Sequence, residues 1–196
     1  MCWNLLIKTH KILAYNILEQ ASQDKKFLIE KKKFIWGNIK PDCVSKYKLK
    51  KHFYDESIDM ILEKIDFLST LTVEEIYSSY GKNKFSSELG VICHFICDFF
   101  CLAHYRRWRL KSALKKHMTY EQELGRIAKS FEFKKVSQEL KDIKDVQGFI
   151  TGNILKYEEL YEYYDEDLNY SFFICCNIVN LLLEVISKNE YEKKAG

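Results

Sequence analysis

Apolar residues recur at the three- and four-residue spacing of amphipathic helices along nearly the whole chain. One stripe near the N-terminus consists of Leu5, Leu6, Ile12, Leu13 and Ile17. Another stripe, within residues 56–68, consists of Ile58, Ile61, Leu62, Ile65 and Leu68. Each stripe predicts a helix that turns one face toward a core.

The segments between these stripes carry helix boundary signals. WGNIKPD, residues 36–42, holds the only proline and predicts a loop, because proline fixes its own φ and pushes the preceding residue toward extended geometry. A short helix is expected to end near Gly81, and Ser86 or Ser87 is expected to cap the next helix, which carries residues 90–105. Further helices are expected near residues 118–131, 145–164 and 169–188.

The composition supports an all-α fold. Only 7 glycines and 1 proline occur in 196 residues, whereas proteins built from strands and tight turns need many of both. The hydrophobic fraction of 47% suffices for one core, and the net charge of +3 does not favour nucleic acid or membrane as a partner. We therefore expect a single helical domain over residues 1–196, with residues 90–105 and 169–188 at its centre.

Cysteine usage and apolar stretches bear on the compartment. The 7 cysteines form an odd set without framework spacing, which is typical of reduced thiols. The N-terminal MCWNLLIKTHK lacks the apolar run and cleavage site of a secretory signal. Residues 171–186 are shorter than the ~20 residues of a membrane-spanning helix and are interrupted by Asn177, Asn180 and Glu184. These features predict a cytoplasmic protein without a transmembrane segment.

Candidate chemistry is concentrated in GVICHFICDFFCLAHY, residues 90–105, which places two histidines and an aspartate in an apolar helix. If this helix is continuous, Asp98 lies about 40° to one side of His94 and His104 about 80° to the other, so all three share one side. Burying the carboxylate of Asp98 is costly unless it is paired, and no lysine or arginine lies in the neighbouring turns. A metal ion is therefore the expected partner.

His117 and Glu121 add a second pair, because side chains four residues apart on a helix can reach one ion. Any one of these residues alone is more often a packed core histidine or a solvated acid. Together they favour a zinc site, since neutral imidazole and carboxylate are typical zinc ligands.

The full pattern resembles the bacterial zinc-dependent phospholipase C family, whose superfamily includes zinc-dependent single-strand nucleases. The resemblance rests first on H-x3-D-x5-H and H-x3-E, which fall at His94, Asp98, His104, His117 and Glu121. Upstream, the family order of a helix histidine, a Pro-Asp pair and a further histidine falls at His10, Asp42 and His52. The resemblance implies an all-α bundle, two to three zinc ions and a ligand role for all 5 histidines.

The resemblance also implies how the ligands are shared. One ion would be held by Asp42, His52, His94 and Asp98. A second would be held by His10 and the other oxygen of Asp98, and a third by His104, His117 and Glu121. In the family the second set is completed by the amine and carbonyl of an N-terminal tryptophan. Here that residue is Trp3, two residues from the start, and Cys2 is either a replacement ligand or a bystander.

For function, the resemblance implies that a zinc-bound hydroxide attacks a phosphodiester, with phospholipid as the substrate and the third zinc stabilising the leaving alkoxide. The family pattern assigns to Asp42 the catalytic role of orienting or deprotonating the water. Asp55 is a rival for this role, although an acid three residues after His52 is more often a solvated residue in the first turn of a helix.

Three further features stay open between a functional and a structural interpretation. Cys93, Cys97 and Cys101 form a helical stripe beside the candidate ligands and are either ligands or small packing residues. The basic segment at residues 105–117 either steers an anionic substrate, with peripheral membrane contact, or is a solvated loop. The acidic, tyrosine-rich residues 157–170 are expected to form an exposed helix end.

Three functions remain under these constraints. A phosphodiesterase of phospholipase C type is favoured by the ligand order and the helical fold. A single-strand nuclease or nucleotidase on the same zinc cluster is favoured by the basic segment and the expected cytoplasmic location. A non-catalytic zinc-binding module would keep the ligands without an open coordination position.

Overall fold

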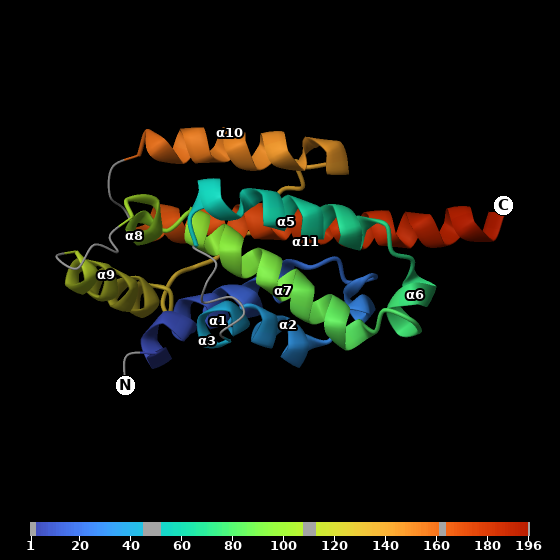
Figure 1. Cartoon of the computed structure of the whole chain (residues 1–196), viewed down its shortest axis with the longest axis horizontal. Helices are drawn as coiled ribbons and strands as arrows, with labels where there is room; N and C mark the ends of the chain where they lie inside the picture. The colour runs from blue at the N-terminus through green and yellow to red at the C-terminus, as the bar shows by residue number, and fades with distance from the viewer. Residues whose placement is uncertain (1–2, 45–51, 108–112, 161–163, 196) are drawn as a thin grey trace.

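The computed structural model describes residues 3–44, 52–107, 113–160 and 164–195, and these residues form helices and turns without a strand (Figure 1). The N-terminal part contains α1 (Trp3–Gln20), η1 (Lys26–Leu28), α2 (Lys31–Gly37) and α3 (Lys40–Cys43). The middle contains α5 (Tyr54–Ser69), α6 (Val73–Tyr77), α7 (Lys82–Phe99) and α8 (Leu102–Tyr105). The C-terminal part contains α9 (Leu114–Ile127), η2 (Ile143–Asp145), α10 (Val146–Glu158) and α11 (Tyr164–Ala195). The expected all-α fold is confirmed.

Helices α7 and α11 lie at the centre of the bundle. In Figure 1, α7 crosses the middle of the molecule in front of α11, with α1 and α2 below it and α5 and α10 above. Every residue of α7 from Leu89 to Phe99 is buried, and this helix packs against α2, α5 and α11. The apolar segments of the sequence therefore form the core, as their composition indicated.

A close contact between two backbones joins α2 to α7. A Cβ atom on Gly90 would lie 2.3 Å from the carbonyl oxygen of Phe34, and one on Gly37 would lie 2.2 Å from the carbonyl oxygen of Ser87. Only glycine fits at both positions, because real Cβ atoms do not approach other atoms this closely. The contact brings the C-terminal end of α2 against the middle of α7, where the candidate ligands begin.

Two expected helix boundaries were wrong. Of the loop expected at residues 36–42, only residues 38–39 form a turn; residues 36–37 end α2 and residues 40–42 begin α3, because Pro41 occupies the first turn of a helix, where no backbone N–H is needed. Helix α7 begins at Lys82, after Gly81 with φ +91°, a conformation that glycine adopts readily. The hydroxyl of Ser86 accepts from the backbone N–H of Glu30 instead of capping α7.

The expected continuous helix over residues 90–105 was also wrong. Helix α7 ends at Phe99, Cys101 is extended (φ −108°, ψ 121°), and the four-residue α8 begins at Leu102. The backbone N–H of Leu102 is bonded to Asp167 of α11, so a tertiary contact supports this new start. His104 therefore reaches the candidate site from a separate short helix.

Helix α11 is longer than expected and is held in the core. By length and composition the stretch Tyr164–Tyr191 could cross a membrane, but 67% of its apolar window is buried inside the protein, as in the core helix of a soluble fold. The polar residues that interrupt its apolar run bind loops: Asn177 accepts from the backbone N–H of Leu140, and Asn180 accepts from that of Ser22.

Candidate metal centre

The structure brings all eight predicted site residues together. His94 and Asp98 lie on α7, His117 and Glu121 lie on α9, and the remaining residues come from four other places: His10 on α1, Asp42 on α3, His52 just before α5 and His104 on α8. Each of the five histidines is at most 9% exposed. Three groups of ligand atoms arise, each with its atoms within 4.8 Å of one another: His10, His94 and Asp98; Asp42, His52 and His94; and His104, His117 and Glu121.

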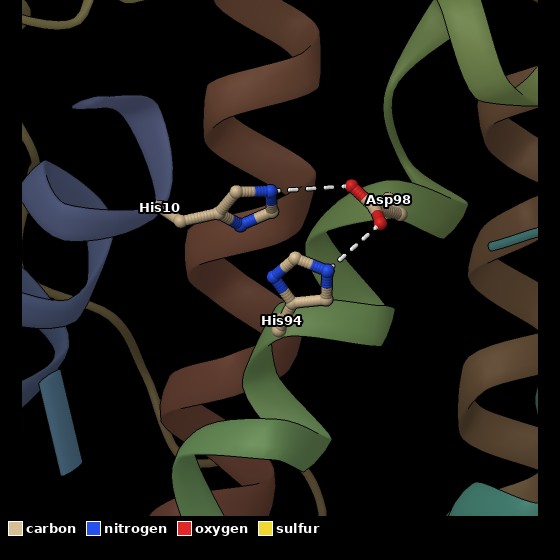
Figure 2. A group of neighbouring side chains, drawn as sticks. All are labelled: His10, His94 and Asp98. Carbon is tan, nitrogen blue, oxygen red and sulfur yellow. Dashed lines mark ion pairs between the residues drawn. The ribbon is translucent and has the colours of Figure 1, made fainter. Parts of the chain in front are cut away.

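Asp98 is the centre of the arrangement, and its two oxygens face different imidazoles. Oδ1 lies 3.3 Å from Nε2 of His10, which projects from α1, while Oδ2 lies 3.3 Å from Nε2 of His94 one turn earlier on α7 (Figure 2). Oδ2 also lies 2.6 Å from Nδ1 of His52. One buried carboxylate thus contacts two of the three groups directly.

The separations within the group around His94 suit a small cation. His94 Nε2 and His52 Nδ1 are 3.2 Å apart, and a tetrahedral zinc ion with bonds of about 2.0–2.1 Å would place its ligand atoms roughly 3.3 Å from each other. Asp42 stands farther back, with Oδ1 3.8 Å from His94 Nε2 and 3.9 Å from His52 Nδ1. The donors of this group fit zinc.

The backbone fixes the tautomer of His94. Its Nδ1 lies 2.9 Å from the carbonyl oxygen of Asn38, and because a carbonyl only accepts, Nδ1 carries the hydrogen. The lone pair of a neutral His94 is therefore on Nε2, which faces Asp98 and His52. A histidine held in this way by its other nitrogen is typical of metal ligands.

The third group lies beside Asp98 on the shorter helices. Glu121 Oε1 is 2.9 Å from Nε2 of both His104 and His117, and His104 Nε2 is 3.6 Å from Asp98 Oδ1. Within the part of the chain that the structure describes, neither Glu121 Oε2 nor His117 Nδ1 has a hydrogen-bond partner although both are buried. Buried polar atoms normally have a hydrogen-bond partner. An oxygen without one, on the carboxylate that contacts two imidazoles, fits a site that binds a cation.

The imidazoles stabilise the buried carboxylates in their charged form. Burial acts to raise the pKa of Asp98, but the surrounding histidines hold it well below its usual range. Burial likewise acts to raise the pKa of Glu121, and hydrogen bonds from His104 and His117 lower it to about 2. Burial lowers the pKa of His52, whereas contact with Asp98 outweighs burial and raises the pKa of His10.

The structure places most of the residues for which the sequence left a functional and a structural interpretation open. Asp55 is an exposed residue in the first turn of α5, paired with Arg107, and belongs to none of the three ligand groups. Cys93, Cys97 and Cys101 are buried in the core, and no group of three ligand atoms among the described residues includes them. In the basic segment, Arg109 and Lys111 lie outside the described residues, whereas Arg106 and Lys115 are exposed at the ends of α8 and α9.

Sequence reasoning missed two residues that support the site. Asn38 acts through its backbone carbonyl, which no sequence signal reveals. Asp167, within the stretch expected to be an exposed helix end, is 2% exposed and accepts hydrogen bonds from Tyr120 and Tyr157. Burial raises the pKa of Asp167 to about 7, although these donors act in the opposite direction. Tyr157, the first residue of the acidic stretch, was the available signal, because a buried phenol needs a partner.

Comparison with known proteins agrees with this chemistry. The family profile described as zinc dependent phospholipase C matches residues 9–174, which include every candidate ligand. No curated protein and no solved structure matches the chain.

Proposed function

Because the chain belongs to the zinc-dependent phospholipase C family, we propose that it is a zinc-dependent phosphodiester hydrolase that acts on phospholipids. One observation carries the proposal: three groups of histidine and carboxylate ligand atoms gather around a single buried carboxylate, Asp98. Five buried imidazoles are not needed to fill the core, since apolar residues of similar size would fill the same space without a desolvation cost.

We propose that the chain holds two to three zinc ions. Asp42, His52, His94 and Asp98 would hold the first, His10 and Asp98 would contribute to the second, and His104, His117 and Glu121 would hold the third. Bound zinc would supply Lewis acidity, which lowers the pKa of a coordinated water toward ~7 and offsets the negative charge of a phosphodiester. Trp3 and Cys2, candidates for completing the second set, have no described side chains.

Asp42 is suited to orienting the attacking water. Its side chain is 17% exposed, compared with 4% for Asp98 and 12% for Glu121, so it is the carboxylate with most access to solvent. Its Oδ1 stands 3.8 Å from His94 Nε2, beyond hydrogen-bond distance, which leaves this oxygen able to accept a hydrogen bond from water. Asp42 would hold that water and take its proton as the nucleophile forms.

Exposed cations near the site suit an anionic substrate. Arg106 follows the helix that carries His104. Lys115 lies in the first turn of α9, two residues before His117. Positive charge at these helix ends would attract a phosphate-bearing surface and favour peripheral contact with a membrane.

We further propose one domain and a cytoplasmic location, supported by the buried thiols of Cys97, Cys175 and Cys176.

The experiment pairs a metal count with an activity assay. Plasma mass spectrometry of the purified protein should give two to three zinc ions per chain, and the protein should hydrolyse a chromogenic phosphodiester. Asp98→Asn should lose zinc and reduce hydrolysis to background, because it removes the charge that two ligand groups share. Asp59→Asn, an exposed acid on α5, is the matched control and should behave as the unsubstituted protein.

The substrate is tested by comparing phosphatidylcholine vesicles with single-stranded DNA. Release of a phosphorylated headgroup from the vesicles would support the proposal. Cleavage of DNA alone would assign the centre to a nuclease, and zinc binding without any turnover would leave a non-catalytic zinc module. Absence of zinc from the purified protein and from protein incubated with zinc would refute the metal centre itself.

A further inference from the structure

The third ligand group lies on two helices, α8 and α9, and the shorter of them does not fix its own position. Helix α8 has four residues, far fewer than an isolated helix needs to be stable, and it follows a break in the chain at Cys101. Cys101 stands at the N-cap of α8, but its side chain does not cap the helix. The orientation of His104 must therefore be set by contacts from elsewhere in the fold.

Asp167 of α11 supplies such a contact to both helices. Its Oδ2 accepts from the backbone N–H of Leu102 (3.1 Å), the first residue of α8, and from the hydroxyl of Tyr120 (2.9 Å) on α9. Leu102 precedes His104 by two residues, and Tyr120 directly precedes Glu121. One oxygen atom thus ties together the two helices that carry the third group.

The remaining oxygen and the surroundings keep Asp167 in place. Oδ1 accepts from the hydroxyl of Tyr157 (2.5 Å) on α10, a helix that carries none of the eight candidate ligands. Asp167 is 2% exposed and lines a cavity of about 20 Å³ together with His10, Asp98 and Glu121. The carboxylate therefore lies beside the ligand groups, and a helix without candidate ligands helps to hold it.

We propose that Asp167 is a positioning residue for the third zinc: it holds α8 and α9 in the relative position that lets His104, His117 and Glu121 bind one ion. The proposal rests on the proposed zinc centre. Hydrogen-bond acceptance by Oδ2 is the property that matters, because both ligand-bearing helices donate to that one atom. Loss of a hydrogen bond that orients ligands typically weakens metal binding by about 10- to 100-fold.

The first test compares two substitutions at position 167 in the full-length protein. Zinc affinities are measured by competition with a chromophoric chelator, and the third zinc is identified as the ion that His117→Ala eliminates. Asp167→Ala should weaken that ion by about 10- to 100-fold and leave the others unchanged. Asp167→Asn should largely restore its affinity, because the amide oxygen still accepts from Leu102 and Tyr120 while the amide nitrogen donates to the Tyr157 hydroxyl.

The second test uses two tyrosines that donate to the same carboxylate. Tyr120→Phe and Tyr157→Phe each delete one buried hydroxyl, from residues 8% and 5% exposed. Both should lower the free energy of unfolding by similar amounts, but Tyr120→Phe should weaken the third zinc several-fold more than Tyr157→Phe, since only Tyr120 lies on a helix that carries ligands. This pair decides the question even if Asp167→Ala does not fold.

The outcomes separate this proposal from the one it rests on. Equal weakening of the third zinc by the two tyrosine substitutions would overturn the positioning role and leave Asp167 a structural residue. An unchanged third zinc in a folded Asp167→Ala protein would overturn it too. If His117→Ala eliminates no zinc from the unsubstituted background, the third site itself is wrong, and the proposed centre fails before Asp167 is considered.

Discussion

The two halves of the candidate centre are held in place by different means. The half around His94 and Asp98 belongs to one continuous buried helix, and α2 is pressed against that helix by the contact between Gly37 and Gly90. The half around Glu121 belongs to the short helix α8 and to α9, which meet through hydrogen bonds to Asp167. Core packing therefore fixes the helix of the first half, whereas in the second half a buried polar contact joins two helices that also pack against their neighbours.

This difference teaches how a protein can place ligands from many segments around one point. Close-packed interiors transmit any change in volume, so the first half should respond strongly to an added methyl group. Hydrogen bonds and charges depend on protonation, so the second half should respond to pH.

The largest effect is expected from Gly90→Ala. The added Cβ would lie within 3.0 Å of three backbone atoms, which cannot move without separating α2 from α7. We expect a loss of about 3 kcal/mol in the free energy of unfolding, measured by urea denaturation, together with loss of zinc from the first set. Gly152→Ala is the matched control: nothing lies within 4 Å of the added atom, and the protein should gain about 0.5–1 kcal/mol.

Retention of both stability and zinc in Gly90→Ala would break the comparison, because the first half would then not depend on the backbone contact. Loss of the third zinc in place of the first would have the same consequence.

A smaller effect is expected from acid on the second half. In the chelated protein the folded-state pKa of Glu121 is about 2, compared with 4.5 for an unperturbed glutamate. A depressed carboxyl pKa contributes stability above pH 4.5 that is lost as the pH falls toward 2, and a shift of this size corresponds to about 3 kcal/mol at full strength. The difference in free energy of unfolding between the unsubstituted protein and Glu121→Gln should therefore be greatest above pH 4.5 and shrink toward pH 2.

A difference between these two proteins that stays constant from pH 6 to pH 2.5 would show that Glu121 is not held by its charged hydrogen bonds. Gly90→Ala, by contrast, should lose the same free energy relative to the unsubstituted protein across this range, because an added methyl group does not titrate.

The smallest effect is expected at an exposed ion pair that belongs to neither half. Asp55 at the start of α5 pairs with Arg107 beyond α8, with side chains 62% and 49% exposed. Exposed ion pairs contribute about 0.2–1 kcal/mol, so Asp55→Asn should shift the melting temperature only slightly and leave phosphodiester hydrolysis unchanged.

The comparison variant for catalysis is Asp42→Asn, which should abolish hydrolysis. A loss of turnover in Asp55→Asn with full zinc content would transfer the water-orienting role from Asp42 to Asp55.

Parts of both halves were accessible from the sequence. The apolar run around His94 and Asp98 predicts a buried helix, and a buried aspartate without a neighbouring cation predicts a metal partner. The spacing of His117 and Glu121 places both on one face of α9. These inferences need only local periodicity and the cost of burying a charge, which one sequence contains.

The rest depended on contacts between distant segments. After the break at Cys101, the backbone N–H that starts α8 is accepted by Asp167, 65 residues after Leu102. Asn38 contributes a backbone carbonyl, a group that every residue has, and its role follows only from the place where α2 ends. Asp167 itself lies in an acidic stretch that has the composition of a solvated surface, and only its two tyrosine donors distinguish it.

The glycine pair has a consequence for how this sequence can change over time. Gly37 and Gly90 touch each other, so neither position tolerates a side chain while the other helix keeps its place. Drift at either position would displace Asn38 from His94 while all the histidines remained in the sequence. In related chains, loss of either glycine should therefore mark a centre that no longer binds metal, even where all the ligand residues are still present.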